Sequence, residues 1–144
     1  MITHYTLGFL FNPEKTRVVI MKKLRPSWQL GLLNGVGGHI EKGERPLHCM
    51  KREFKEEVDY IGYDKLDWKR YASLYSPKFY MNCYTAIGDL SYVKSKTPEK
   101  VSVMDIDDIK LKDNRFVENV PWLISMAIDF LEDGRPTSTT IHYK

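Results

Sequence analysis

The sequence contains few cysteines and no long apolar segment, and both absences narrow its class. Cys49 and Cys83 are the only cysteines, without C-x-x-C spacing or a neighbouring histidine cluster. We therefore expect two buried thiols rather than a disulfide, a zinc site or a nucleophile. No apolar run approaches the roughly 20 residues that span a bilayer, and the N-terminus lacks the pattern of a signal peptide. These absences predict a cytoplasmic protein with no membrane partner.

The sequence also lacks a large excess of charge of either sign. The chain has 22 Lys and Arg against 19 Asp and Glu, mixed along the sequence, for a formal net charge of +3. This excess gives no strong nucleic-acid signal and suits a small polyanionic substrate equally well. The 144 residues are 42% hydrophobic and contain no repeat or low-complexity block. We expect a single domain over residues 1–144, as a monomer or homodimer.

The most informative segment runs from Gly38 to Tyr60. Pro46 suits the first turn of a helix, where its missing N–H costs nothing. At roughly 100° per residue, Glu53, Glu56 and Glu57 then share one helix face. The neighbouring stripe is apolar and the opposite side is charged or polar: Leu47, Met50, Phe54 and Val58 face the core, while His48, Lys51 and Lys55 face water.

Three carboxylates on one helix face repel one another, and only Arg52 stands close enough in sequence to offset them directly. Mg²⁺ would relieve this repulsion, since it binds through one or two carboxylates, waters and substrate phosphate. Before the helix, Gly35, Gly37 and Gly38 predict a turn with close backbone approach. An isolated E-x-x-E-E segment would indicate a solvated helix, but the preceding glycines favour a metal and phosphate site.

This segment resembles the Nudix box of hydrolases that act on nucleoside diphosphate-linked compounds, G-x5-E-x7-R-E-U-x-E-E-x-G-U, where U is bulky and apolar. The matching residues are Gly38, Glu44, Arg52, Glu53, Phe54, Glu56 and Glu57. Asp59 replaces the last glycine, and Tyr60 occupies the final bulky position. Because Asp tolerates left-handed geometry, we expect Asp59 to end the helix there, with a local rather than a catalytic consequence.

The resemblance implies a Mg²⁺-dependent enzyme, with Mn²⁺ as an alternative ion. Its implied catalytic residues are Glu53, Arg52, Glu56 and Glu57, and its implied metal ligands are Glu53, Glu56, Glu57 and the Gly38 carbonyl. Glu53 is the best general base within the box, although some family members take the base from a later loop. Arg52 would orient Glu53 or its neighbours, and Glu44 would support the box. For Arg52 and Glu44 alone, a structural salt bridge is the default interpretation.

A carboxylate outside the box often completes such metal sites in the family. Glu99 is the first choice, followed by Asp89 and Glu118, although each also suits an ordinary surface position. A second acidic cluster favours a turn after a strand over a cation site; its members are Asp105, Asp107 and Asp108.

Substrate selection depends on residues upstream of the box. The stretch from Met21 through Gly38 resembles the oxidised purine nucleoside triphosphatases of the family, in which the position of Asn34 recognises the base. The Asn34 amide can donate and accept, as a purine edge requires, but it equally suits a turn before Gly35. Lys23 would meet phosphate or nucleoside if it faces the cleft, and water otherwise. Five aromatics could stack a base but more readily serve packing: Tyr75, Phe79, Tyr80, Tyr84 and Trp122.

The remaining pattern predicts strands and a second helix. Strands are expected at residues 4–11, 17–23, 68–74, 79–87 and 101–106, with a turn at 12–15. A helix is expected at residues 122–132 after Pro121, stopped by Gly134 and Pro136. Residues 137–144 form either a flexible tail or an edge strand at 138–143. Spacing alone supports an α/β or α+β class, and the resemblance implies an α/β/α sandwich with a mixed sheet between helices.

Three functions follow. The leading one is hydrolysis of a nucleoside triphosphate, such as 8-oxo-dGTP or another purine deoxynucleotide, to monophosphate and pyrophosphate. The runner-up is hydrolysis of another nucleoside diphosphate-linked substrate: ADP-ribose, a dinucleotide polyphosphate or an RNA 5′ end. A non-catalytic nucleotide-sensing domain is the third, and it would be expected to lack a box glutamate. All of them are present.

Overall fold

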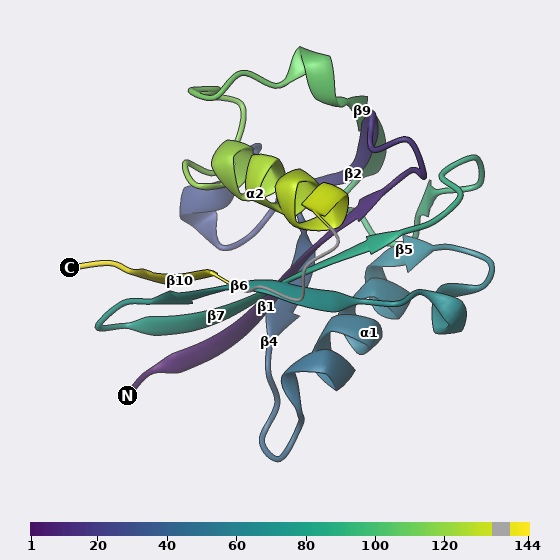
Figure 1. Ribbon diagram of the computed structural model, residues 1–144. Helices are drawn as coiled ribbons and strands as arrows, with labels where there is room; N and C mark the ends of the chain where they lie inside the picture. The colour runs from purple at the N-terminus through teal and green to yellow at the C-terminus, as the bar shows by residue number, and fades with distance from the viewer. Residues whose placement is uncertain (134–138) are drawn as a thin grey trace.

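The computed structural model describes residues 1–133 and 139–144, which are built around an eight-stranded mixed sheet (Figure 1). Its strands are β1 (Thr3–Phe11), β2 (Arg17–Lys22), β3 (Leu33–Asn34), β4 (Val36–His39), β6 (Lys69–Tyr75), β7 (Phe79–Ile87), β9 (Val101–Asp105) and β10 (Thr139–His142). The order is β10-β6-β7-β1-β2-β3, with β4 also paired to β1 and β9 to β2. The central β1 and β7 are parallel, and β1 is antiparallel to β4.

Two helices cover opposite faces of this sheet (Figure 1): α1 (Pro46–Glu57) and α2 (Val120–Asp133). Alternate residues of β1 point to the two faces, so Phe9 packs with the α2 core and Leu10 with the α1 core. Leu123 anchors α2 in its core, while Met50 and Phe54 anchor α1. The molecule is therefore the predicted α/β/α sandwich around a mixed sheet.

Shorter elements complete the chain. A two-stranded ribbon pairs β5 (Val58–Asp59) with β8 (Lys94–Ser95). Single turns of 3₁₀ helix occur at η1 (Ser27–Gln29), η2 (Tyr63–Lys65) and η3 (Ile106–Asp108). These pieces lie in the connections, and η1 borders the cleft described below.

Most element predictions are confirmed. The strand expected at 79–87 has those bounds, and three others differ from their predicted bounds by one residue at one end. The strand expected at 68–74 is shifted by one residue, to 69–75, and α1 begins at Pro46 as expected. The second helix begins two residues earlier than predicted, at Val120, and continues to Asp133. The edge-strand alternative for the tail is confirmed, because β10 pairs in parallel with β6. The predicted stop at Gly134 and Pro136, with the start of that tail, lies outside the described residues.

The glycine turn predicted at residues 35–38 is wrong. Val36–His39 forms strand β4, in which Gly37 and Gly38 pair with Leu7 and Thr6 of β1. The prediction of close backbone approach is nevertheless right, because a Cβ on Gly37 would collide with the Thr6 carbonyl. These glycines therefore permit tight strand pairing rather than a reversal of the chain.

The expected left-handed end of α1 at Asp59 is also wrong. The helix gives way to extended backbone at Val58, with φ −123° and ψ 126°, and Asp59 pairs with Lys94 in the β5–β8 ribbon. A strand needs no glycine at this position, which explains how the chain accommodates the departure from the box.

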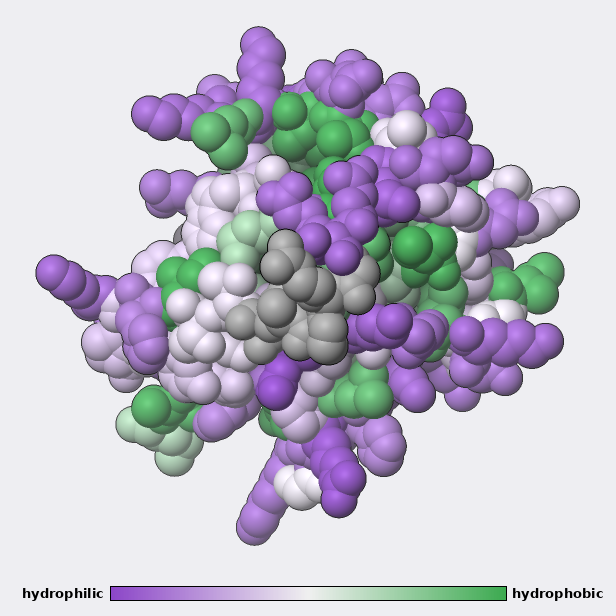
Figure 2. Space-filling view, in the orientation of Figure 1, coloured by the Kyte–Doolittle hydropathy of each residue, from purple (hydrophilic) through white to green (hydrophobic). Residues whose placement is uncertain are grey.

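Both cysteines are free and fully buried, as predicted. Burial raises the pKa of the Cys49 thiol to about 11 and that of Cys83 further, so both stay protonated. No helix in the described part of the chain is long and apolar enough to cross a membrane. The visible face is mainly hydrophilic, with apolar side chains in separate patches (Figure 2).

Candidate active site

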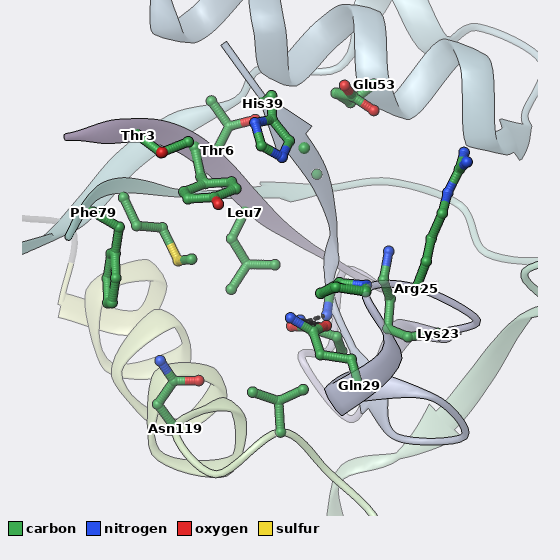
Figure 3. Close-up of a pocket in the computed structure, with 18 of the residues that line it drawn as sticks. Thr3, Thr6, Leu7, Lys23, Arg25, Gln29, His39, Glu53, Phe79 and Asn119 are labelled. Atoms are coloured by element: carbon green, nitrogen blue, oxygen red, sulfur yellow. Dashed lines mark hydrogen bonds between the residues drawn. The ribbon is translucent and has the colours of Figure 1, made fainter. Parts of the chain in front are cut away.

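A cleft of about 1350 Å³ lies where β1, β4, α1, the connection after β2 and the start of α2 meet. Glu53, Lys23 and Arg25 lie on one side of it, while Phe79 and Asn119 lie on the other (Figure 3). The first side gathers most of the charge, and the second presents apolar and amide groups next to Lys78 and Glu118. Such an arrangement suits a ligand with an anionic end and a flat, partly apolar end.

Two box glutamates form the acidic side. Glu53 lies against the β4 backbone, since a Cβ on Gly38 would stand 2.5 Å from Glu53 Oε1. Glu57, one helical turn later, has a buried Oε2 without a hydrogen-bond partner among the described residues. Burial, reinforced by the charge of Glu53, raises the pKa of Glu57 to about 8, although Lys23 acts in the opposite direction.

Arg52 ties these elements together. Its Nε and Nη2 donate to the two carboxylate oxygens of Glu44 at 2.7 and 3.0 Å, and its Nη1 donates to Glu53 Oε1 at 3.1 Å. Nη2 also donates to the carbonyl of His39 at 3.2 Å. One guanidinium therefore connects the loop before α1, strand β4 and a cleft carboxylate, the positions expected from the roles predicted for Arg52 and Glu44.

The Glu44 carboxylate gives a pH-dependent prediction. The Arg52 hydrogen bonds lower its pKa to about 2 against the opposing effect of burial. A lowered carboxylate pKa stabilises the fold above the unfolded value and loses that contribution as pH falls toward 2. We expect Glu44→Gln to lower the free energy of unfolding by about 1 to 3 kcal/mol at pH 7. Denaturant unfolding from pH 7 to pH 3 should show the difference in the free energy of unfolding between wild type and variant becoming smaller. A difference independent of pH would contradict the role of the Glu44 charge.

Glu56 lies apart from the other box acids. Its side chain is 56% exposed, its Oε2 lies 3.2 Å from Arg52 Nη1, and it does not line the cleft. The prediction that all three glutamates share one helix face is therefore too coarse. Glu53 and Glu57 lie on the side of α1 that faces the cleft, while Glu56 is rotated toward solvent. A metal-ligand role for Glu56 stays a prediction.

Of the three acids proposed outside the box, the structure brings Glu99 to this pair. Glu99 is 3.1 Å from Lys23 Nζ and accepts a hydrogen bond from the Leu24 amide at 2.8 Å. Although burial alone would raise the pKa of Glu99, these partners lower it. Asp89 instead accepts hydrogen bonds from Ser91 and does not line the cleft.

The remaining candidate acids have other neighbours. Glu118 is exposed and lines the cleft beside Asn119. In the second acidic cluster, Asp105 ends β9 and pairs with Arg17 at 2.9 Å. Asp107 and Asp108 are exposed in η3, as the turn interpretation expects.

Asn34 lies on the cleft wall and is 9% exposed. Its Oδ1 accepts a hydrogen bond from the Gly35 amide at 2.8 Å, and its Nδ2 donates to Gln29 Oε1 at 3.2 Å. Both alternatives for this residue are therefore compatible with its position: the amide braces the local backbone and is presented to the cleft together with Gln29.

The aromatic candidates divide between packing and lining. Phe79 and Trp122 line the cleft. Tyr84 is buried in the α1 core, and the rings of Tyr75 and Tyr80 pack on each other with centroids 4.3 Å apart. None of these three tyrosines lines the cleft, so Phe79 and Trp122 are the ones placed to meet a base.

The NUDIX domain family model matches residues 3–122 of this chain. The chain belongs to the Nudix family. It is thereby a hydrolase of nucleoside diphosphate-linked substrates. No curated protein sequence matches it closely enough to count as a relative.

Solved Nudix structures share this fold. A Nudix hydrolase from Nitrosomonas europaea has a TM-score of 0.72 at 14% identity, covering 99% of this chain and 80% of the other. The MutT protein from Bacillus halodurans has a TM-score of 0.67 at 16% identity, covering 99% and 91%. A Nudix-family hydrolase from Clostridium perfringens has a TM-score of 0.66 at 17% identity, covering 91% and 99%. The TM-scores establish a shared fold, and identities this low do not identify the substrate.

Nudix hydrolases generally use divalent metals such as Mg²⁺, and the acidic side of this cleft fits such an ion. Glu57 Oε2 is a buried oxygen with no protein donor among the described residues, and Glu53 stands beside it against Gly38. Among the described residues, no three or more His, Cys, Asp or Glu side chains are grouped so that they alone could hold a metal ion. Two carboxylates with backbone oxygen, water and substrate phosphate form a typical Mg²⁺ environment.

The Nudix box leaves several cleft residues unpredicted. Arg25, Trp28 and Gln29 come from the connection after β2. Asn119 immediately precedes α2, and its Nδ2 lies 3.4 Å from Tyr143 Oη. Tyr143 also lines the cleft. Sequence alone carries little signal for these positions, because they lie in connections and at element ends that are far apart in the chain.

Proposed function

We propose that this Nudix protein is a Mg²⁺-dependent pyrophosphohydrolase that converts a nucleoside triphosphate to nucleoside monophosphate and pyrophosphate. The observation that carries the proposal is the paired Glu53 and Glu57 on the charged side of a cleft whose other side presents Phe79 and Trp122. The carboxylates suit a metal-bound polyphosphate, and the aromatic rings suit a base.

Residues of the acidic side have distinct roles in this proposal. Glu53, Glu57 and the Gly38 carbonyl would hold Mg²⁺, with Glu56 contributing as the box pattern implies. An ion held there would neutralise charge that develops on the phosphoryl oxygens and would lower the pKa of a bound water. Glu53, fixed by Arg52, accepts the proton from the attacking water, and Glu99 is held facing the pair by Lys23.

We further propose that Asn34 reads the base and favours a purine, including an oxidised one. Its support is the amide pair with Gln29 on the cleft wall. Purine edges offer both donors and acceptors, which an amide can match. Lys23 serves substrate phosphate indirectly, since its ammonium is already paired with Glu99.

The Asn34→Ala variant tests base reading. We expect the ratio of kcat/KM between purine and pyrimidine triphosphates to change by about 10-fold or more, because a lost substrate hydrogen bond changes discrimination rather than chemistry. The Mg²⁺ concentration that gives half-maximal rate should stay the same. A proportional loss on every base would instead identify Asn34 as a brace for Gly35, which its second hydrogen bond also permits.

A substrate panel tests the reaction itself. Canonical and oxidised nucleoside triphosphates, ADP-ribose, dinucleotide polyphosphates and 5′-triphosphate RNA should be incubated with Mg²⁺, and the products resolved into phosphate and pyrophosphate. Pyrophosphate from a triphosphate supports the proposal. Preferential cleavage of a capped diphosphate would replace it with the runner-up reaction, and tight binding without turnover would favour a nucleotide sensor.

A further inference from the structure

Four cationic side chains line the cleft, and they differ in whether they form ion pairs within the protein. Lys23 is paired with Glu99 at 3.1 Å, and Arg52 is held by Glu44 at 2.7 Å. Lys78 lies next to Phe79, on the aromatic side. Arg25 is exposed, and within residues 1–133 and 139–144 no hydrogen bond or ion pair involves its side chain. Its guanidinium is therefore available to a ligand.

The chain positions Arg25 at the acidic side. The Leu24 amide, immediately before it, donates to Glu99 Oε2 at 2.8 Å, which fixes the backbone beside the carboxylates. The side chains of Lys23 and Arg25 both extend toward α1, the helix that carries Glu53 (Figure 3). Arg25 is thus a free cation at the end of the cleft where the metal-bound phosphate is proposed to lie.

Charge complementarity specifies what Arg25 can bind. Lys23 is paired with Glu99, and Arg52 is paired with Glu44 and Glu53. Among the cleft residues that the structure describes, Arg25 is therefore the cation left at the acidic side for the phosphates beyond a magnesium-bound one. A guanidinium offers a planar fork of donors that matches two phosphate oxygens. Its exposure suits a terminal phosphate, which carries the most charge and stays partly hydrated.

We propose that Arg25 binds the terminal phosphate of the substrate and selects nucleotides that end in a free polyphosphate over capped diphosphates such as ADP-ribose. This inference rests on the proposed function and gives the substrate a direction in the cleft. The nucleoside lies toward Phe79 and Trp122, and the polyphosphate runs past Glu53 and Glu57 to Arg25.

The experiment compares Arg25→Gln and Arg25→Lys with the control Arg45→Gln, an exposed arginine that does not line the cleft. Arg25→Gln should lower kcat/KM for a nucleoside triphosphate by about 10- to 100-fold, mainly through KM, because a charge-assisted fork is lost. Activity on ADP-ribose should change less than threefold. Arg25→Lys should recover part of the affinity, and Arg45→Gln should match the wild type.

A binding measurement separates this inference from the proposed function. Titration calorimetry with inorganic tripolyphosphate and Mg²⁺ reports the Arg25 contact even if no tested nucleotide is hydrolysed. Weaker binding by Arg25→Gln than by Arg45→Gln supports the assignment. Equal tripolyphosphate binding by the two variants, or an equal loss of activity on capped and uncapped substrates, overturns it.

Discussion

The Glu57→Gln variant is expected to lose Mg²⁺-dependent turnover by about 100-fold or more while remaining folded. Glutamine keeps the volume and one oxygen but removes the charge that the cation requires. Because Glu57 is buried beside another carboxylate, its charge opposes folding in metal-free buffer, so the variant should be at least as stable there. Steady-state kinetics over a range of Mg²⁺ concentrations and denaturant unfolding in chelator measure both effects.

Two further glutamate variants make this result specific. Glu14→Gln changes an exposed acid outside the cleft and should keep wild-type turnover. Glu56→Gln should cause a smaller loss than Glu57→Gln, since Glu56 is exposed and paired with Arg52. Wild-type turnover in a folded Glu57→Gln protein would contradict the assignment of this pair to the metal, and equal losses at Glu56 and Glu57 would contradict the difference between their positions.

Local features of the sequence were enough to predict the helix that carries the box. Pro46 sets its start, and the apolar spacing places Met50 and Phe54 in the core, as the structure confirms. The motif also gave the register that brings Arg52 to Glu44. Propensity and periodicity act over a few residues, so they identify such elements without knowledge of their partners.

Features that depend on long-range pairing were less accessible. The Gly35–Gly38 segment lacks the alternating apolar and polar side chains that predict a strand. Only its pairing with β1 shows that it is extended. The sequence leaves Glu99 as one of three candidates, because it does not show that the segment of Glu99 lies beside Lys23. The helical wheel groups Glu56 with Glu53 and Glu57, because it cannot show which part of the acidic face borders the cleft.

Replacing the adjacent glycines of β4, Gly37 and Gly38, with alanine should have different effects on stability and turnover. At Gly37, an added Cβ meets the Thr6 backbone carbonyl, which can move only if β4 and β1 separate. We expect Gly37→Ala to lower the free energy of unfolding by about 3 kcal/mol. Denaturant unfolding checks this value, and a loss below about 1 kcal/mol would show that the strands accommodate a methyl group.

At Gly38, the added Cβ would instead meet the end of a side chain, 2.5 Å from Glu53 Oε1. A carboxylate can swing aside at little cost to the fold, so Gly38→Ala should stay folded while Glu53 leaves its place beside Arg52. A displacement of about 1 Å can cost about 100-fold in rate, and we expect a fall in kcat of that order. Kinetics and denaturant unfolding should therefore be measured for both alanine variants. Gly37→Ala should lose more stability, and Gly38→Ala should lose more turnover per folded molecule. If Gly38→Ala keeps full turnover, the position of Glu53 against β4 does not matter for the reaction, and the general base must be sought elsewhere in the cleft.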